Sequence, residues 1–243
     1  MERAGHGRPN VTKEIVTKMN SANPLETARD LYFSGKFSEA VEIWSEMSEK
    51  GDIEAKAWLG SCYANGDGVG LDDSIALGYF EEAATGGNAL AQANAGAFHF
   101  MGRGTSKNTE KAVKWLEMAA ANNDLNGLFN LAQIYFQGSG VEVDYEKSAN
   151  FYQKAAELGH YPSQARLGQM YINGQGVEKS RVKAYLWLSL ASQHGIGTAL
   201  EALNGIVADM SAEEKAEGQQ LFNTWRVQTI KEAPQVAIVP APS

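Results

Sequence analysis

The chain has 243 residues, of which 44% are hydrophobic and 21% are charged, so it is long enough to bury a sizeable core in one or two domains. Its 29 Asp and Glu residues outnumber its 21 Lys and Arg residues, which gives a formal net charge of -8. This balance argues against nucleic acid as a partner, because binding phosphates requires a basic surface, and it gives no attraction to an anionic membrane.

Residues 1–21 show no helical periodicity and contain no apolar segment typical of a signal peptide. No run of about 18 apolar residues occurs anywhere, so we expect no membrane insertion. The sequence as given therefore predicts a cytoplasmic protein. A periplasmic or secreted protein is the alternative if the natural chain has a leader that this sequence lacks.

Residues 22–51 predict a first helical hairpin with a short turn. Ala40 and Gly51 lie 36 positions before Ala76 and Gly87, which belong to the repeats that follow. We interpret this segment as a degenerate copy of the same unit.

Residues 52–196 contain four copies of a 36-residue pattern. Each copy has an apolar first helix, a Gly-x-Gly turn, a small polar residue suited to capping a helix, and a second apolar helix. Gly or Asn ends the copy, because these residues tolerate the left-handed conformation at a helix end. The matching positions are Leu59, Ala95, Leu131 and Leu167 in the first helix, Gly66, Gly102, Gly138 and Gly174 at the turn, Asp72, Asn108, Asp144 and Ser180 at the cap, and Gly87, Asn123, Gly159 and Gly195 at the end.

Each copy predicts two helices of about 12 to 14 residues joined by a glycine turn. Small residues such as Gly60 and Ala76 allow the two helix axes to approach closely. Because one hairpin cannot bury its own apolar stripe, the copies must stack. We therefore predict an all-α fold, a right-handed α-α superhelix (solenoid) of stacked helical hairpins. The turn glycines are explained by positive φ angles and not by phosphate binding, which would need a preceding strand.

Residues 197–230 are expected to cap the array. Ala199 and Leu203 continue the register of a first helix. Ser211 and Glu214 have the spacing of a capping box, which would open a last helix that ends near Thr229. Residues 231–243 contain three prolines and predict a disordered tail.

The pattern Leu-Gly-x-x-Tyr-x-x-Gly-x-Gly-Val-x-x-Asp, with Ala-x-x-Tyr or Trp and Ala-Ala-x-x-Gly after it, resembles the Sel-one-like repeat (SLR). This family is a longer-looped relative of the tetratricopeptide repeat, and residues 22–51 resemble a plain tetratricopeptide-like hairpin. The resemblance implies a protein-interaction scaffold, commonly bacterial and active in signalling, envelope regulation or host contact. Some members have a cysteine pair in each repeat, and β-lactam binding is attributed to some of these. This chain departs from them, because its one cysteine is Cys62.

In tetratricopeptide-like pairs the first helix lines the concave groove, a surface suited to extended peptides or helices. Four positions in each copy should face it, namely Ala57, Ser61, Ala64 and Asn65 in the first copy, and the equivalents of Ala57 include Ala93 and Ala165. Large apolar residues edged by amides are typical of a recognition site. No Arg or Lys occupies these positions, so we expect no selection for phosphate or carboxylate. The predicted binding residues are Phe100, Met101, Phe129, Gln133, Phe136, Gln137, Gln169, Ile172 and Asn173.

An alternative is that these side chains pack against a neighbouring helix or against the chain's own termini. The two interpretations differ in whether the side chains are exposed.

No group of residues predicts catalysis, and we expect neither a cofactor nor a metal site. His99 occupies the position of Tyr63 and should be a packed ring, and Cys62 should be a small buried hydrophobe. Ser180 and Lys183 match the Ser-x-x-Lys of penicillin-recognising enzymes, but the accompanying motifs are missing and Ser180 lies in the cap register.

We therefore predict a non-enzymatic scaffold or adaptor that binds a peptide or helix of a partner protein in the concave groove. Bacterial signalling or envelope regulation is the expected setting, and the expected state is a monomer or weak self-association. The alternative is a hydrolase or binder of β-lactams or cell-wall fragments, resembling the cysteine-rich members of the family.

Overall fold

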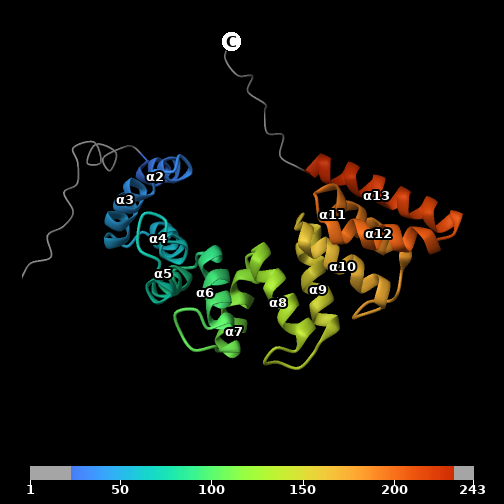
Figure 1. Ribbon diagram of the computed structural model, residues 1–243, viewed down its shortest axis with the longest axis horizontal. Helices are drawn as coiled ribbons and strands as arrows, with labels where there is room; N and C mark the ends of the chain where they lie inside the picture. The colour runs from blue at the N-terminus through green and yellow to red at the C-terminus, as the bar shows by residue number, and fades with distance from the viewer. Residues whose placement is uncertain (1–22, 233–243) are drawn as a thin grey trace, which may run out of the picture. The chain divides into compact units, whose positions relative to one another are not determined.

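The computed structural model describes the main chain of residues 23–232 and the side chains up to residue 228 (Figure 1). Residues 1–22 and 233–243, which include the predicted irregular segment and most of the predicted tail, lie outside the described residues. The described residues form twelve α-helices and no strand, which confirms the all-α fold. The helices are α2 (Pro24–Phe33), α3 (Phe37–Glu49), α4 (Ile53–Asn65), α5 (Asp73–Thr85), α6 (Ala89–Met101), α7 (Thr109–Ala121), α8 (Leu125–Gln137), α9 (Tyr145–Glu157), α10 (Tyr161–Asn173), α11 (Arg181–Gln193), α12 (Gly197–Asp209) and α13 (Ala212–Glu232).

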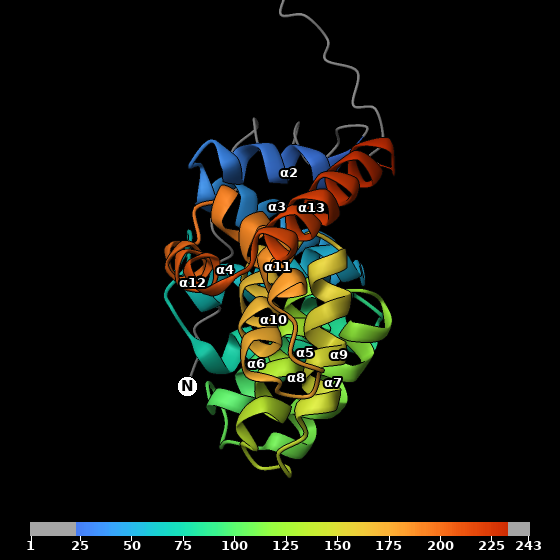
Figure 2. The same cartoon turned by 90° about the vertical axis from the view of Figure 1, so that its right-hand side faces the viewer.

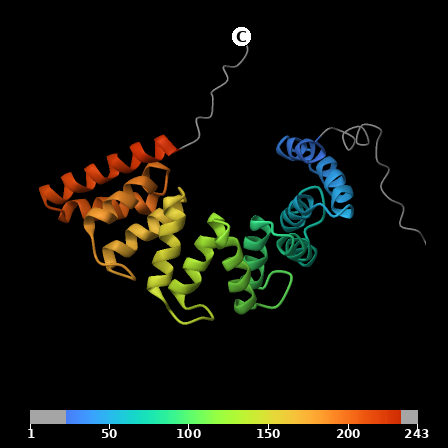
Figure 3. The ribbon, with the colours of Figure 1, turned by 180° about the vertical axis from the view of Figure 1, so that it is seen from behind.

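The chain divides into two compact units, Met1–Asn130 and Leu131–Ser243, with the boundary inside α8. In the first unit, hairpins α2–α3, α4–α5 and α6–α7 follow one another. In the second unit, α9 packs against α10, α10 against α11, and α11 against both α12 and α13. The same hairpins can be followed from behind in Figure 3. None of the helices in the described part combines the length and apolar content needed to cross a bilayer.

The second helix of each repeat starts where its predicted cap lies. Asp72 Oδ1 accepts hydrogen bonds from the main-chain N–H groups of Ser74 and Ile75, at 2.9 and 3.0 Å. Asn108, Asp144 and Ser180 each accept one main-chain N–H from the residue three positions later. Because these bonds satisfy N–H groups that have no partner within the helix, each cap contributes about 1 kcal/mol.

Glycines in the first helices allow the two helices of a hairpin to pack closely. A Cβ atom on Gly60 would lie 2.6 Å from the Phe80 ring, and one on Gly168 would lie 2.6 Å from Leu188 Cγ. Gly96 has the same relationship to Leu116. The predicted role of small residues at this position is therefore confirmed.

The glycine turns also join neighbouring hairpins. Arg103, which lies between two turn glycines, donates hydrogen bonds from Nε to Asp73 Oδ2 at 3.1 Å and from Nη2 to the Ala64 carbonyl at 3.1 Å. A Cβ atom on Gly104 would lie 2.2 Å from the main-chain oxygen of Asp73. The turn of one repeat therefore lies directly on the start of the second helix of the preceding repeat.

The N-terminal hairpin packs on the first repeat as a further unit. Trp44 of α3 is fully buried and stacks on Trp58 of α4, with ring centroids 4.9 Å apart and planes at 7°. Ala28 and Leu59 are buried in the same cluster. Residues of the degenerate hairpin and of the first repeat therefore share one core.

The C-terminal helices cover the last repeat. The predicted capping box is present, because Ser211 N–H donates to Glu214 Oε2 at 2.9 Å and Glu214 N–H donates to Ser211 Oγ at 3.2 Å. Helix α13 ends at Glu232, three residues later than predicted, and it packs against α11 (Figure 2). Trp225 meets the Trp187 ring edge to face at 4.8 Å, which fixes the two helices together.

Candidate peptide-binding site

All nine predicted binding residues lie on first helices and none is fully buried. Phe100, Met101 and Phe129 belong to the first unit, and the other six belong to the second. Met101 is the most exposed apolar residue of the set, with 57% of its surface accessible. The exposed members are Met101, Gln137, Gln169 and Asn173, and the half-buried members are Phe100, Phe129, Gln133, Phe136 and Ile172.

The prediction was wrong for Ala57 and Ala93, which lie two residues before the core position of the first and second repeats. Ala57 and Ala93 are buried, with 3% and 2% of their surface exposed, and Ala57 belongs to an apolar cluster with Ala76 and Phe80. In these two repeats the small side chain packs within the core, whereas Phe129, at the equivalent position of the third repeat, is half-buried.

Four of the predicted residues line one pocket in the second unit, which we call the α8–α10 pocket. Gln133, Phe136 and Gln137 come from α8, and Gln169 comes from α10. The first three share one face of α8 because they are spaced by three and four residues. The pocket has a volume of about 110 Å³. Small-molecule sites usually have about 300–1,000 Å³, so its size fits one side chain of a partner.

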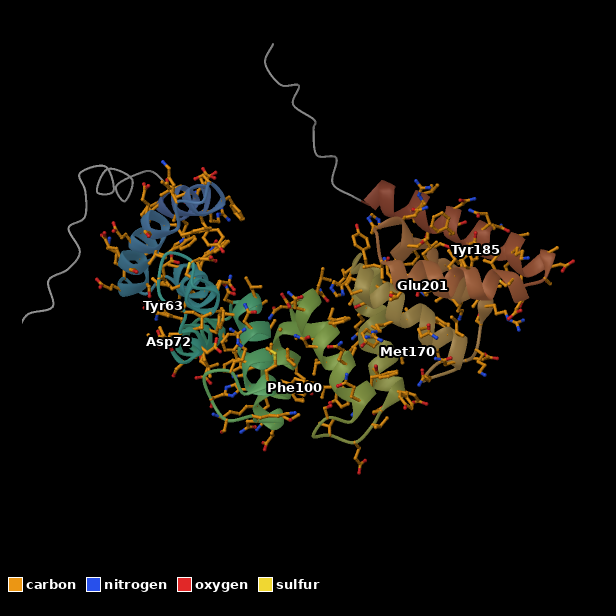
Figure 4. All side chains as sticks on the ribbon, in the orientation of Figure 1. Tyr63, Asp72, Phe100, Met170, Tyr185 and Glu201 are labelled. Carbon is orange, nitrogen blue, oxygen red and sulfur yellow. The ribbon has the colours of Figure 1, made fainter. Side chains whose placement is uncertain are left out.

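The floor of the α8–α10 pocket is made of Tyr152 from α9 and Met170 from α10, each with 2% of its surface exposed. Met170 is labelled in Figure 4. Burial raises the pKa of Tyr152 to about 12, and the positive charge of Arg166 acts in the opposite direction. The Tyr152 hydroxyl is therefore neutral at any physiological pH.

Arg166 also lines the α8–α10 pocket, and the prediction missed it. It precedes Gln169 by three residues and Met170 by four, so all three side chains share one face of α10. No Arg or Lys occupies the assumed positions themselves, but Arg166 adds a cation beside them. The spacing from Gln169 was the signal in the sequence, but the four assumed positions in each repeat did not include this one.

A second hollow, the α10–α12 cleft, adjoins the pocket because Gln169 lines both. Ile172 lines this cleft opposite Ala202 and Ile206 of α12, and its volume is about 780 Å³. Its rim carries charges of both signs. The charged rim residues are Lys179, Arg181, Asp209 and Glu214.

Some predicted binding residues are partly covered by other parts of the chain. The Phe136 ring meets Tyr145 of α9 edge to face at 5.2 Å, and the Lys107 ammonium lies 4.7 Å above the Phe100 ring. Packing against a neighbouring helix, which the sequence left open as an alternative, therefore accounts for part of the Phe136 surface. Phe136 also lines the α8–α10 pocket.

The residues that the sequence offered as candidates for catalysis or metal binding are engaged in helix capping or packing. Ser180 Oγ accepts the Lys183 N–H at 3.2 Å as a helix cap, while Lys183 Nζ lies 5.4 Å above the Tyr171 ring. His99 is buried with Nε2 2.8 Å from Glu81 Oε1, and Cys62 is a buried free thiol. Within residues 23–228, no group of three or more His, Cys, Asp or Glu side chains could hold a metal ion.

Comparison with known proteins agrees with the repeat seen in the structure. The Sel1 repeat family matches residues 53–88, 89–124, 126–160 and 162–196, which together make up more than half of the chain. A search of curated protein sequences found no match.

Solved structures with the same repeat are similar over most of the chain. A Sel1 repeat protein from Oxalobacter formigenes is 27% identical with a TM-score of 0.71, and the match covers 88% of this chain and 84% of that one. The protective antigen c5321 of uropathogenic Escherichia coli, described as having an SLR fold, is 27% identical with a TM-score of 0.72, and the match covers 94% of this chain and 48% of that one. A putative Sel1 repeat protein from Klebsiella pneumoniae, at 19% identity and a TM-score of 0.53, shares the fold.

Proposed function

Because this chain belongs to the Sel1 repeat family, whose members are generally protein-interaction scaffolds, we propose that it is a non-enzymatic adaptor that binds a segment of a partner protein along its first helices. Bacterial signalling or envelope regulation is the proposed setting. The α8–α10 pocket, which lies in the second unit, is the proposed centre of binding in that unit.

The observation that carries this proposal is the convergence of Gln133, Phe136, Gln137 and Gln169 on one pocket. An apolar side chain of the partner would lie against Phe136 above the buried floor. Carboxamides at the rim can donate to and accept from the main chain of an extended segment. A preformed helical scaffold lowers the ordering cost of such binding.

The test is capture of partners by the purified chain, followed by mass spectrometry. We expect the variant with both Phe129→Ala and Phe136→Ala to lose specific partners that the wild type retains. Its helical circular dichroism should be unchanged and its melting temperature only slightly lower, because both phenylalanines are half-buried and neither belongs to the fully buried core.

Met118→Ala is the matched control, since Met118 is an exposed apolar residue of α7 outside the predicted set. It should retain every partner. Retention of the same partners by the double variant would contradict the proposal. A large loss of stability in the double variant would show that the two phenylalanines belong to the core. The expected state, a monomer or weak self-association, stays a prediction, to be checked by light scattering at two concentrations.

A further inference from the structure

We propose that the α8–α10 pocket recognises an acidic residue beside an apolar one in its partner, with Arg166 as the residue that selects the carboxylate. This inference rests on the proposed function and names the chemistry of the segment bound there. It reverses the expectation, drawn from the sequence, that this surface would not select anions.

The first argument is the state of Arg166 itself. Of the arginines in the described helices and turns, Arg29, Arg103 and Arg181 pair with carboxylates, and Arg226 lies over the Phe222 ring. Among the described residues Arg166 has neither an ion pair nor an aromatic ring beneath it. An unpaired guanidinium is notable in a chain whose net charge is -8, because acidic side chains outnumber basic ones.

The second argument is the composition of the pocket wall. No carboxylate is among its lining residues, which comprise four glutamines, Phe136, Tyr152, Arg166 and Met170. An incoming carboxylate would therefore meet one cation and neutral amides, with no like charge in the wall. A guanidinium binds a carboxylate in a bidentate, charge-assisted arrangement, which is stronger than a neutral hydrogen bond.

The third argument is that hydrogen-bonding capacity is free on both sides of the guanidinium. Among the described residues the carboxamides of Gln133 and Gln169 have no hydrogen-bond partner. Those of Gln137 and Gln175 each use their oxygen, accepting from Ser139 Oγ and Asn173 Nδ2 at 3.2 Å. Free amides on α8 and α10 can hold the main chain of an extended segment while its carboxylate meets Arg166.

The size of the pocket determines the apolar part of the recognised sequence. Its volume of about 110 Å³ over a floor of Tyr152 and Met170 takes a single apolar side chain. Arg166 is exposed at the edge of the same pocket. The carboxylate that it binds must therefore belong to a residue close in sequence to the buried apolar one.

The experiment uses the full chain and two pools of short biotinylated peptides with amidated C-termini. One pool has Leu-Asp at its centre, the other has Leu-Asn, and all flanking positions are drawn at random from uncharged residues. We expect the wild type to bind the Leu-Asp pool roughly tenfold or more tightly than the Leu-Asn pool. Arg166→Gln should remove this preference, and Arg166→Lys should keep part of it. Arg29→Gln, a surface arginine paired with Glu54, is the control and should keep all of it.

Two outcomes would overturn the inference. Equal binding of both pools, lost together in Phe136→Ala, would refute carboxylate selection and leave peptide binding at this pocket in place. Binding of neither pool by the wild type would refute an acidic extended segment as the ligand, whereas partner capture by the full chain decides the proposed function separately. Acidification offers a further check, because binding of the Leu-Asp pool should weaken below about pH 4 as the peptide carboxyl is protonated.

Discussion

Gly176 lies so close to the main chain of Tyr145 that a Cβ atom at Gly176 would be 1.9 Å from the Tyr145 carbonyl oxygen. Gly176 is the second glycine of the turn after α10, and Tyr145 is the first residue of α9 in the preceding repeat. Gly104 and Asp73 have the same relationship two repeats earlier along the chain. The second turn glycine is therefore needed for contact between repeats as well as for its positive φ.

This contact predicts that Gly176→Ala is more destabilising than alanine at another positive-φ glycine. Gly159 is the matched control, because its φ is +86° and no atom lies within 4 Å of a Cβ placed there. Gly159→Ala should lose about 1 kcal/mol of unfolding free energy for the left-handed backbone, and Gly176→Ala should lose roughly 1.5 kcal/mol or more beyond that, because the main chain of Tyr145 must move. Urea denaturation measures both values, and equal losses would show that the contact has no energetic effect.

Packing between the helices of one hairpin predicts that alanine substitutions at two helical glycines change the stability in opposite directions. Gly168→Ala should destabilise by about 1–3 kcal/mol, because the new methyl group would lie 2.6 Å from Leu188 Cγ in the core. Gly78→Ala should stabilise by about 0.5–1 kcal/mol, since Gly78 is exposed within α5 and has open space around it. Thermal melts followed by circular dichroism distinguish them, and the interpretation fails if both variants shift in the same direction.

The buried thiol of Cys62 should react very slowly in the folded protein. Burial raises its pKa to about 12, with the charge of Asp67 adding to the effect, and only the thiolate reacts. At about pH 8 the reaction with an aromatic disulfide reagent should therefore be at least about a thousandfold slower than in denaturant. Met118→Cys in a Cys62→Ala background supplies an exposed thiol that should react at the rate of a free cysteine. Rapid labelling of Cys62 in the native chain would contradict its burial.

The ion pair between Arg103 and Asp73 predicts a pH dependence of stability. The Arg103 guanidinium, which hydrogen-bonds to Asp73, holds the pKa of that carboxyl below its usual range. The unfolded chain then binds this proton more readily than the folded one, so the stabilisation is present above the usual pKa and is lost as the pH falls through the lowered value. The melting temperature of the wild type should exceed that of Asp73→Asn at neutral pH, and the gap should narrow below about pH 4. A gap that widens on acidification would be inconsistent with this pairing.

The helices and their caps could be predicted because their determinants are local. Asp72, Asn108, Asp144 and Ser180 cap helices with their own side chains, and the Ser211–Glu214 capping box spans four residues. A 36-residue period then fixes how the units follow one another, because each depends on its neighbour for burial.

The features that the sequence could not supply depend on contacts between helices. The contact between Gly176 and Tyr145 could not be predicted, because the sequence alone does not show which residue of the preceding repeat the turn meets. Arg166 was missed because the four assumed positions in each repeat did not include its own. Ala57 was wrongly placed on the binding surface because its packing with Ala76 and Phe80 depends on a neighbouring helix. The pocket is formed by side chains of α8, α9 and α10 together, so its set of lining residues cannot be read from any one helix.

The contact of each turn with the preceding hairpin constrains how such a chain can change length during evolution. Loss or duplication of 36 codons, or of a multiple of 36, returns the second turn glycine of a repeat to an equivalent carbonyl oxygen, as Gly104 and Gly176 show. An insertion of any other size within the array brings a side chain to a place where only hydrogen fits. Gene rearrangements that add or remove recognition surfaces should therefore survive selection only in steps of one whole hairpin.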